Sequence, residues 1–214
     1  FQGVIFCHNI PSGETFDSLR IKYPIVMCSQ YNKDEDIPYV VVDDYNSAKN
    51  AVNYLLSVGK KRIAFINSSK NYSYSPLREK GFRDALKASG NPVNDNWIIH
   101  LTDIDFNVAF SVATTLLSSC DKPDAIFCAS DVYACAALKA AHTLHLSIPE
   151  DVAVMGFDNV NLTTMTVPTI STVSQPTYQL GYQSCNLLVD QIEGNPVPNQ
   201  KIVLATEIVV RSST

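Results

Sequence analysis

The stretch that decides the fold is Val152–Asp158, with the sequence VAVMGFD. Its first six residues are apolar without alternation, which is typical of a parallel strand covered on both faces. Asp158 follows where the strand ends, and in open α/β sheets ligands bind outside the carboxyl ends of the strands. Asp158 is therefore a candidate ligand-binding carboxylate. The alternative is that it caps the next helix, but Asn159–Met165 is a weak helical pattern.

Similar apolar, β-branched or aromatic runs recur along the chain and alternate with helical patterns. The other predicted strands are Val4–Cys7, Ile25–Ser29, Tyr39–Asp43, Arg62–Asn67, Trp97–Leu101, Ala125–Cys128, Thr169–Val173, Ile202–Leu204 and Glu207–Val210. The predicted helices are Asn46–Val58, Pro76–Ser89, Asn107–Ser118, Asp131–His145 and Tyr178–Glu193. This order predicts an α/β protein with parallel sheets and right-handed crossovers.

Two further carboxylates follow apolar runs in the same way as Asp158. Asp43 comes after Val40–Val42, and Ser130-Asp131 comes after Ile126–Ala129. Each position supports two interpretations, either a ligand-binding group at a strand end or a helix cap. Because Asp131 opens a clear helical pattern, capping is the favoured interpretation there, and it is also slightly favoured for Asp43.

Composition and charge exclude several classes of protein. The 214 residues are 46% apolar and 17% charged, and no apolar run approaches the roughly 18 residues that span a bilayer. The net charge is −5 and the densest basic cluster is Lys60–Arg62, so we expect no membrane association and no DNA binding by this segment alone. The sequence contains no GxSxG, P-loop, GxGxxG or HExxH motif, and His142 and His145 have no further metal-binding residue at useful spacing. We therefore predict no enzyme activity, no metal and no cofactor.

The six cysteines show no CxxC pair. Cys7, Cys28 and Cys128 lie within apolar, strand-like runs. Disulfide frameworks and zinc sites have closer or more regular spacing. The pattern favours free, buried thiols in a reducing compartment, and hence a cytoplasmic protein.

Nine segments, in order along the whole chain, resemble the LacI/GalR family of transcription repressors. They are Gly3–Phe6 (GVIF), Val41–Asp44 (VVDD), Ala51–Leu55 (AVNYL), Gly59–Ile66 (GKKRIAFI), Arg78–Phe82 (REKGF), Pro123–Phe127 (PDAIF), Ser130-Asp131, Ile148–Asn159 (IPEDVAVMGFDN) and Val209–Thr214 (VVRSST). Among the branches of the family, the sequence looks closest to nucleoside-responsive repressors.

The resemblance implies two Rossmann-like lobes of the periplasmic binding protein-like type I fold, with a small effector held between them. The N-terminal lobe would comprise residues 1–43 and 175–205, and the C-terminal lobe residues 44–174 and 206–214. Family members begin with a helix-turn-helix headpiece, a hinge and a βαβα stretch, none of which precedes Gly3 here. The resemblance thus implies an incomplete N-terminal lobe, short by on the order of 60 residues at about 30 per βα repeat. Operator DNA would be bound only through the absent headpiece.

The resemblance also implies the residues that bind the effector. Arg78 matches an arginine that reaches the effector, and its fixed donors suit sugar or nucleoside oxygens. Asp158 matches a carboxylate that accepts hydrogen bonds from the effector, and Phe106 matches an aromatic residue that stacks on a ring of the effector. The alternative for Arg78 is an exposed helix arginine, and the alternative for Phe106 is simple core packing. The remaining expected contacts are Ser130, Tyr72 and Tyr74 in the C-terminal lobe, and Cys7, Asn9 and Ser29 in the N-terminal lobe.

The expected partners are a nucleoside or sugar effector and a second copy of the chain. In the family, the helix that matches Asp131–His145 and the segment that matches Asn161–Met165 form a two-fold interface. The small residues of that helix (Ala134, Ala136, Ala137, Ala140 and Ala141) permit close helix approach. The alternative function is a periplasmic sugar-binding protein of the same architecture, since fold alone does not separate the two.

Overall fold

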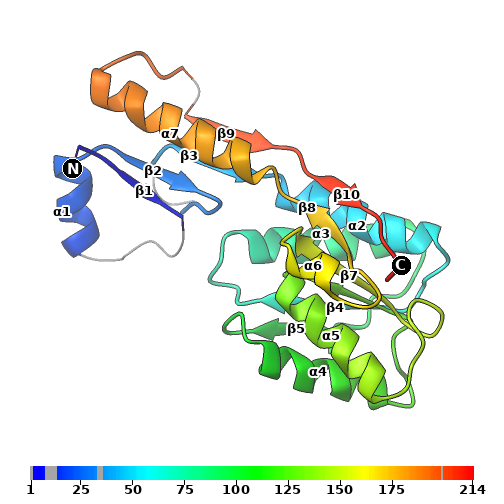
Figure 1. The fold of residues 1–214 in the computed structure, drawn as a ribbon. Coiled ribbons are helices and arrows are strands. Elements are labelled where there is room, and N and C mark those ends of the chain that lie inside the picture. The colour runs from blue at the N-terminus through cyan, green and yellow to red at the C-terminus, as the bar shows by residue number, and fades with distance from the viewer. Residues whose placement is uncertain (1, 8–13, 33–35, 199) are drawn as a thin grey trace. The chain divides into compact units, whose positions relative to one another are not determined.

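The computed structural model describes residues 2–7, 14–32, 36–198 and 200–214. The chain divides into two compact units that each contain a sheet (Figure 1). Unit 1 comprises Phe1–Asp43 and Pro176–Ala205, and unit 2 comprises Asp44–Gln175 and Thr206–Thr214. The chain crosses between the units three times, so each unit is built from segments distant in the sequence.

Unit 2 is built on a six-stranded sheet with the order β10-β8-β7-β6-β4-β5. The strands are β4 (Ile63–Ser68), β5 (Ile98–Leu101), β6 (Ala125–Cys128), β7 (Ala153–Asp158), β8 (Ser171–Ser174) and β10 (Glu207–Val209). Neighbouring strands are parallel except for β10, which runs antiparallel to β8. The predicted parallel α/β architecture is therefore confirmed.

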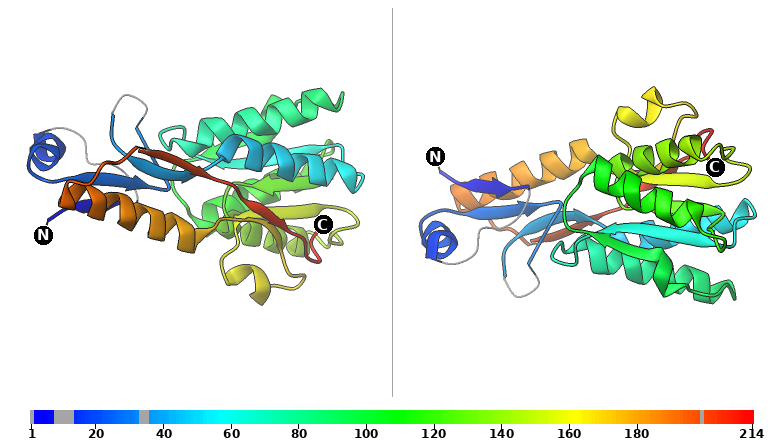
Figure 2. Two further views of the ribbon diagram at one scale, coloured as in Figure 1. Left: turned by 90° about the horizontal axis from the view of Figure 1, so that it is seen from above. Right: turned by 90° about the horizontal axis from the view of Figure 1, so that it is seen from below.

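Helices cover both faces of this sheet (Figure 2). The helices α2 (Asp44–Ser57) and α3 (Tyr74–Ala88) cover one face, and α4 (Phe106–Ser118) and α5 (Asp131–Thr143) cover the other. Alternate strand residues enter the two cores, as Phe65 packs with Phe82 and Phe127 while Ile66 packs on the α4–α5 side. Burial on both faces is the reason why β6 is apolar throughout and β7 is apolar up to its last residue.

Unit 1 has a four-stranded, all-parallel sheet with the order β1-β2-β3-β9. The strands are β1 (Val4–Phe6), β2 (Ile25–Cys28), β3 (Tyr39–Val42) and β9 (Lys201–Leu204), and the helices are α1 (Glu14–Lys22) and α7 (Thr177–Glu193). α7 packs on β1, β2 and β3. It is the longest helix, with 17 residues, and no helix of the described residues is long and apolar enough to cross a membrane.

Several predicted elements differ from those in the structure. α1 was not predicted, because this nine-residue helix is mostly polar and has no clear apolar face. α3 begins two residues before Pro76, so Tyr74 is helical rather than part of a loop; proline is tolerated in the first turn of a helix. Trp97 belongs to the 3₁₀ helix η1 (Asp95–Trp97) and not to a strand, since the Asn94 side chain accepts a hydrogen bond from the Asn96 N–H and starts a tight turn.

The alanines of α5 lie inside unit 2. Ala134, Ala136, Ala137, Ala140 and Ala141 are all completely buried. They pack within the core between α4, α5 and the sheet. The expectation that these small residues face a second copy is therefore wrong, because their size serves close packing within unit 2.

The cysteines are free thiols but only half of them are buried. Cys28, Cys128 and Cys135 are buried, whereas Cys7, Cys120 and Cys185 are exposed. The expectation of buried thiols is thus wrong for Cys120, Cys185 and Cys7. This cysteine follows β1, whose residues are only partly buried, so it lies at the rim of the sheet.

Candidate functional site

The polar groups of unit 2 gather at the carboxyl ends of its parallel strands. Ser68 ends β4, Ser130 follows β6, Asp158 ends β7 and Gln175 follows β8. The register brings them to one edge, since Ile66 lies opposite Cys128 and Asp158 opposite Ser174. This is the edge at which open α/β sheets bind ligands.

Arg78 is the buried cation of this edge. It lies on α3 and is only 4% exposed, which excludes the alternative of an exposed helix arginine. Its Nε donates to Asp44 Oδ1 at 2.8 Å, and its Nη1 donates to the Ala129 carbonyl at 2.8 Å. The guanidinium carbon lies 3.4 Å from the ring centroid of Phe157 and 4.3 Å from that of Tyr74. The side chain is therefore fixed by an ion pair, a backbone acceptor and two aromatic rings.

This arrangement limits how Arg78 can act. Aromatic rings contact the guanidinium, so stacking on a ligand is disfavoured. A guanidinium has five N–H donors in one plane, and the two hydrogen bonds to Asp44 and Ala129 use two of them. The remaining donors suit a ligand oxygen approaching in the guanidinium plane.

Asp158 ends β7 with its carboxylate partly buried. Burial raises the pKa of this carboxyl group, while the charge of Arg78 and hydrogen bonds from Gln175 and Ser130 oppose the rise. Gln175 Nε2 donates to Asp158 Oδ1 at 2.6 Å. A carboxylate so placed accepts hydrogen bonds from a ligand hydroxyl or ring N–H, and its partners fix its orientation.

The turn after Asp158 has an unusual backbone. Asp158 and Asn159 have φ angles of 120° and 62°, which residues with a side chain rarely adopt. Arg211 Nη2 donates to Asn159 Oδ1 at 2.8 Å, and the Asn159 amide donates to Ser174 Oγ at 3.1 Å. Such strained conformations persist only when the surroundings fix them, and they are frequent at functional sites.

Asp131 holds the same turn from the side of α5. Its Oδ2 accepts the Val160 N–H at 2.8 Å and its Oδ1 accepts the Thr172 hydroxyl at 2.6 Å. Burial raises the pKa of Asp131 to about 6, and the nearby Asp158 adds to the rise, although the hydrogen bonds from Thr172 and Val160 oppose it. Capping of α5 by Asp131, the favoured interpretation of the sequence, is thus wrong, because Ser130 Oγ accepts the Val132 N–H and is the cap.

Tyr72 and Tyr74 form a stacked pair beside Arg78. Their ring centroids are 5.3 Å apart and the planes differ by 7°. Burial raises the pKa of Tyr74, and the neighbouring Ser68 hydroxyl and the Arg78 charge oppose the rise. The Ser68 Oγ lies close to Tyr74. It is buried, and it has no hydrogen-bond partner among the described residues.

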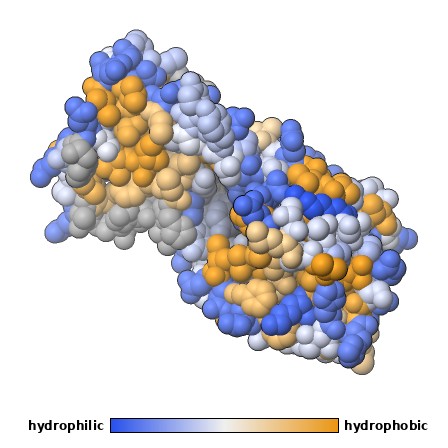
Figure 3. All heavy atoms as spheres, in the orientation of Figure 1, coloured by the Kyte–Doolittle hydropathy of each residue, from blue (hydrophilic) through white to orange (hydrophobic). Residues whose placement is uncertain are grey.

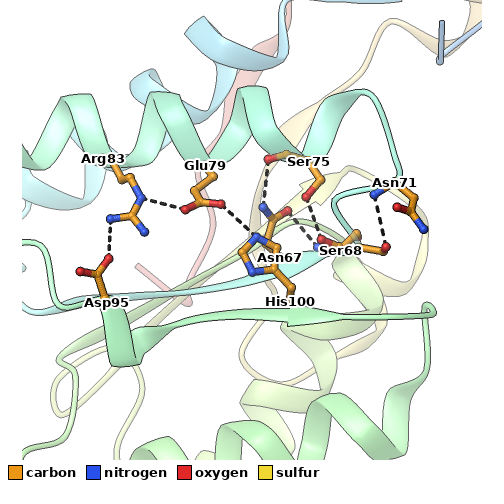
Figure 4. Close-up of polar contacts among 9 residues, drawn as sticks. Asn67, Ser68, Asn71, Ser75, Glu79, Arg83, Asp95 and His100 are labelled. Atoms are coloured by element: carbon orange, nitrogen blue, oxygen red, sulfur yellow. Dashed lines mark hydrogen bonds and ion pairs between the residues drawn. The ribbon is translucent and has the colours of Figure 1, made fainter. Parts of the chain in front are cut away.

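A hydrogen-bond network fixes the start of α3 and hence Arg78. Ser75 Oγ donates to the Ser68 carbonyl at 2.7 Å, and the Asn67 amide donates to the Ser75 carbonyl at 3.0 Å (Figure 4). Asn67 Oδ1 in turn accepts the Ser68 N–H at 2.9 Å. The end of β4 is therefore bound tightly to the first turn of α3.

Further along α3, the Glu79 carboxylate contacts the side chains of Arg83 and His100. Its carboxylate accepts from Arg83 Nε at 2.8 Å and contacts His100 Nε2 at 3.0 Å, and Arg83 Nη1 donates to Asp95 at 2.6 Å (Figure 4). Burial raises the pKa of Glu79, but Arg83 and His100 outweigh it and lower the pKa overall. This cluster fastens α3 to β5 and η1.

Phe106 is the first residue of α4, which follows β5. Its neighbour Asp105 caps the helix by accepting the N–H groups of Asn107 and Val108. The Phe106 ring packs against the α4–α5 core, with Lys139 Nζ 5.5 Å from its centroid. These contacts fit the packing alternative, and a stacking role for Phe106 remains a prediction.

The expected contacts of the N-terminal lobe lie in unit 1. Cys7 follows β1 and is exposed, and Ser29 follows β2 with a φ of 66°. The Ser29 N–H donates to the Val40 carbonyl at 2.8 Å, which continues the pairing of β2 with β3. Asn9 lies outside the described residues.

Two residues of the edge in unit 2 were missed in the sequence. Asp44 is the partner of Arg78, whereas the sequence pattern indicates Asp43, because Asp43 directly follows the apolar run. Gln175 orients Asp158, and the signal for it was its place two residues after the predicted strand Thr169–Val173. The pairings themselves join residues 34 and 17 positions apart, which no local pattern indicates.

The two parallel sheets, the crossings between them and the polar strand ends define a class of protein, the two-unit α/β binding domains of the periplasmic-binding-protein type. Comparison with known proteins leads to the same class. Residues 52–214 match the family model described as periplasmic binding protein-like domain. The chain belongs to this family.

The similar proteins are regulators rather than enzymes. The transcriptional repressor CytR of Escherichia coli (strain K12) is 33% identical over 205 residues, 96% of this chain and 60% of CytR. The transcriptional regulator DegA of Bacillus subtilis (strain 168) is 35% identical over 217 residues, 100% of this chain and 64% of DegA. The chain therefore spans less than two thirds of either relative.

Solved structures show the same architecture. The transcriptional regulator CelR in complex with cellobiose has a TM-score of 0.91 and 27% identity, covering 100% of this chain and 66% of that chain. A LacI-family regulatory protein from Chloroflexus aggregans has a TM-score of 0.86 and 28% identity, covering 93% and 71%.

Proposed function

We propose that this domain senses a small, hydroxyl-bearing effector, either a nucleoside or a sugar, for a DNA-binding transcription regulator. The observation that carries the proposal is the buried, fixed Arg78, which keeps in-plane donors at the strand edge where Asp158 presents an acceptor. A donor and an acceptor held in place suit a ligand rich in hydroxyl groups. Ser130 adjoins Asp158, Tyr74 adjoins Arg78 and Tyr72 stacks on Tyr74, so these three residues are also proposed as effector contacts.

The remaining proposed contacts lie in both units. Phe106 of unit 2, and Cys7 and Ser29 of unit 1, are proposed as further effector contacts because they lie at or next to strand or helix ends. Asn9 is proposed from the resemblance of the sequence alone. We also propose that unit 1 corresponds to the N-terminal lobe of the family and unit 2 to the C-terminal lobe. The relatives support a sugar as the effector, since one solved structure is a complex with cellobiose and another relative is a ribose operon repressor. A nucleoside is proposed from the resemblance of the sequence alone.

DNA binding is proposed only for a longer protein. The net charge of the chain is −5, so it offers little to neutralise DNA phosphates. The relatives of greater length are transcription regulators, which supports a regulator over a periplasmic sugar-binding protein and, with it, a cytoplasmic location.

A second copy of the chain is the proposed protein partner. The segment around α6 (Leu162–Met165) exposes four apolar side chains: Val160, Leu162, Met165 and Val167 are 44%, 38%, 74% and 80% exposed. Figure 3 shows hydrophobic patches between hydrophilic ones on the face of unit 2 that carries α6. We propose that this segment and the exposed side of α5 form the dimer contact, which light scattering of Met165→Asp against the parent protein would test.

A thermal-shift screen tests the effector proposal directly. The chain is heated with cellobiose, ribose, adenosine and cytidine, because a ligand at 100 times its Kd adds about 2.7 kcal/mol of stability. Any ligand found is then titrated by calorimetry into Asp158→Asn, which should weaken binding at least about tenfold. Unchanged affinity in Asp158→Asn, or no shift with any hydroxyl-bearing ligand, would contradict the proposal.

A further inference from the structure

Two thiols end neighbouring strands of unit 1. Cys28 is the last residue of β2, and Cys7 directly follows β1. β1 and β2 are parallel with Phe6 opposite Met27, and the same register places Cys7 opposite Cys28. Neighbouring strands lie about 4.8 Å apart, and a disulfide requires its Cα atoms to be about 4.4–6.8 Å apart. The backbone therefore permits a bond between these two cysteines.

Both side chains point to the same face of the sheet. Cys28 packs with Val26 and Leu187, and Ile5, two residues before Cys7, packs on the same cluster. Side chains alternate along a strand, so Cys7 shares the face of Ile5, which α7 covers.

The thiols also interact with each other. Partial burial raises the pKa of the exposed Cys7 thiol, and the adjacent Cys28, through a hydrogen bond and its charge, and Cys185 of α7 add to the rise. Cys7 thus has two thiols as neighbours, with Cys28 within hydrogen-bonding reach. This cluster plays no part in the contacts of Arg78 and Asp158.

We propose that Cys7 and Cys28 form a reversible dithiol–disulfide site whose oxidant is a small-molecule disulfide. Cys7 is the attacking thiol, because it is exposed to a small molecule, whereas Cys28 is only 7% exposed. Cys28 is the resolving thiol, because it lies opposite Cys7 and needs no access to solvent. Cys120 is exposed in unit 2 and belongs to no such pair of neighbouring strand ends, so it serves as the control.

The chemistry proceeds in two exchanges. The Cys7 thiol loses its proton to solvent, and its thiolate attacks one sulfur of the small disulfide, forming a mixed disulfide and releasing one small thiolate. The Cys28 thiol then gives its proton to the released small thiolate, and the Cys28 thiolate attacks the Cys7 sulfur. This forms the Cys7–Cys28 bond and releases the second small thiolate, which takes a proton from solvent. Two protein thiols are oxidised, one small disulfide is reduced to two thiols, and the reverse sequence restores the dithiol.

The bond would alter the strand end that carries Ser29. Cys28 Sγ lies 3.8 Å from Ser29 Oγ, and Ser29 has the positive φ of 66°. A disulfide bond from Cys28 to Cys7, which follows β1, would restrain Ser29. An effect on effector binding rests on the proposed function, because Ser29 is one of the proposed contacts, but formation of the bond does not.

Thiol mapping without any effector tests the site. The chain is incubated with oxidised glutathione at pH 8, alkylated and digested, and the peptides are identified by mass spectrometry. We expect a peptide that links Cys7 to Cys28 in the parent chain, in Cys120→Ser and in Cys185→Ser. Cys28→Ser should instead accumulate glutathione on Cys7, and Cys7→Ser should lose its Cys28 thiol at least about tenfold more slowly than the parent chain.

Three outcomes would overturn the proposal: both thiols persist, glutathione stays on Cys7 in the parent chain, or Cys7 links to Cys185. Circular dichroism checks that the variants fold, and Cys7→Ser changes an exposed side chain, so its test survives even if Cys28→Ser unfolds. Because the thiolate is the nucleophile, the rate should also rise from pH 7 to pH 9. A failed effector screen leaves this result untouched, so the two proposals fail separately.

Discussion

The two halves of helix α3 each carry an arginine paired with a carboxylate, and they differ in burial rather than in distance. Arg78 and Asp44 are 2.8 Å apart with side chains 4% and 4% exposed. Arg83 lies 2.8 Å from Glu79 and 2.6 Å from Asp95, with the three side chains 30%, 15% and 78% exposed. The distances alone would predict that the buried and the exposed ion pairs contribute equally to stability.

Burial separates their physical roles. A buried charge that loses its partner costs several kcal/mol, because water cannot replace the partner. A pair at the surface contributes about 0–1 kcal/mol, because water solvates each ion when the other is removed. Arg78 is therefore expected to stabilise the strand edge of unit 2 strongly, whereas the contacts of Arg83 with Glu79 and Asp95 should stabilise the packing of α3 against η1 only weakly.

The largest effect should follow removal of the buried partner. Asp44→Ala leaves the Arg78 guanidinium buried beside the Ala129 carbonyl and two aromatic rings. We expect unit 2 to lose about 3–5 kcal/mol of unfolding free energy, measured by urea denaturation. The double variant Asp44→Ala/Arg78→Met should recover part of this loss, because it removes the unpaired charge. A loss below about 1 kcal/mol would place this pair in the same class as the surface pair.

Another carboxylate, Asp131, is buried as Asp44 is, and hydrogen bonds from Thr172 and Val160 stabilise it. Its pKa is raised from 3.8 to about 6, so the folded protein holds this proton more tightly than the unfolded chain. Its contribution to stability is therefore present at low pH and is lost as the pH rises from about 4 to about 6. At about 1.36 kcal/mol per pKa unit, the loss is about 3 kcal/mol.

Unfolding free energies measured from pH 4 to pH 7 test this sign. Asp158 shifts in the same direction, so the difference between the parent and Asp131→Asn isolates the contribution of Asp131. The unfolding free energy of Asp131→Asn should fall less steeply over this pH range than that of the parent. Asp103→Asn, which changes an exposed carboxylate, should follow the parent. Parallel curves for the parent and Asp131→Asn would contradict the prediction.

Gly156 tests how closely Asp131 approaches the sheet. A Cβ atom at this position would lie 2.2 Å from Asp131 Oδ1 and 3.2 Å from Ala134 Cβ. Gly156→Ala should therefore displace the carboxylate and cost about 1–3 kcal/mol. Gly181→Ala is the matched control, because nothing lies within 4 Å of its Cβ and helix α7 should gain about 0.5–1 kcal/mol. Equal unfolding midpoints for both variants would show that Asp131 moves freely.

The contrast along α3 also explains what the sequence could predict. The strands of unit 2 were found because burial on both faces makes them continuously apolar, and Asp158 was selected because it follows such a run. The partner of Arg78 could not be found, since Asp44 lies 34 residues away and meets it only when α2 packs on α3. The role of Asp131 was missed for the same reason, because its acceptors face a turn 29 residues further along the chain.

The smallest effect should come from the exposed end of α3. Asp95→Ala removes the acceptor of Arg83 Nη1, but Arg83 keeps its bond to Glu79 and water replaces the lost carboxylate. We expect about 0.2–1 kcal/mol of destabilisation in dilute buffer, and still less in 1 M salt, where the Debye length is about 3 Å. Asp44→Ala should keep its larger effect in the same salt, because the buried pair is screened much less. The comparison fails if Asp95→Ala matches Asp44→Ala in size, or if salt weakens both effects equally, since burial would then not be what separates the two pairs.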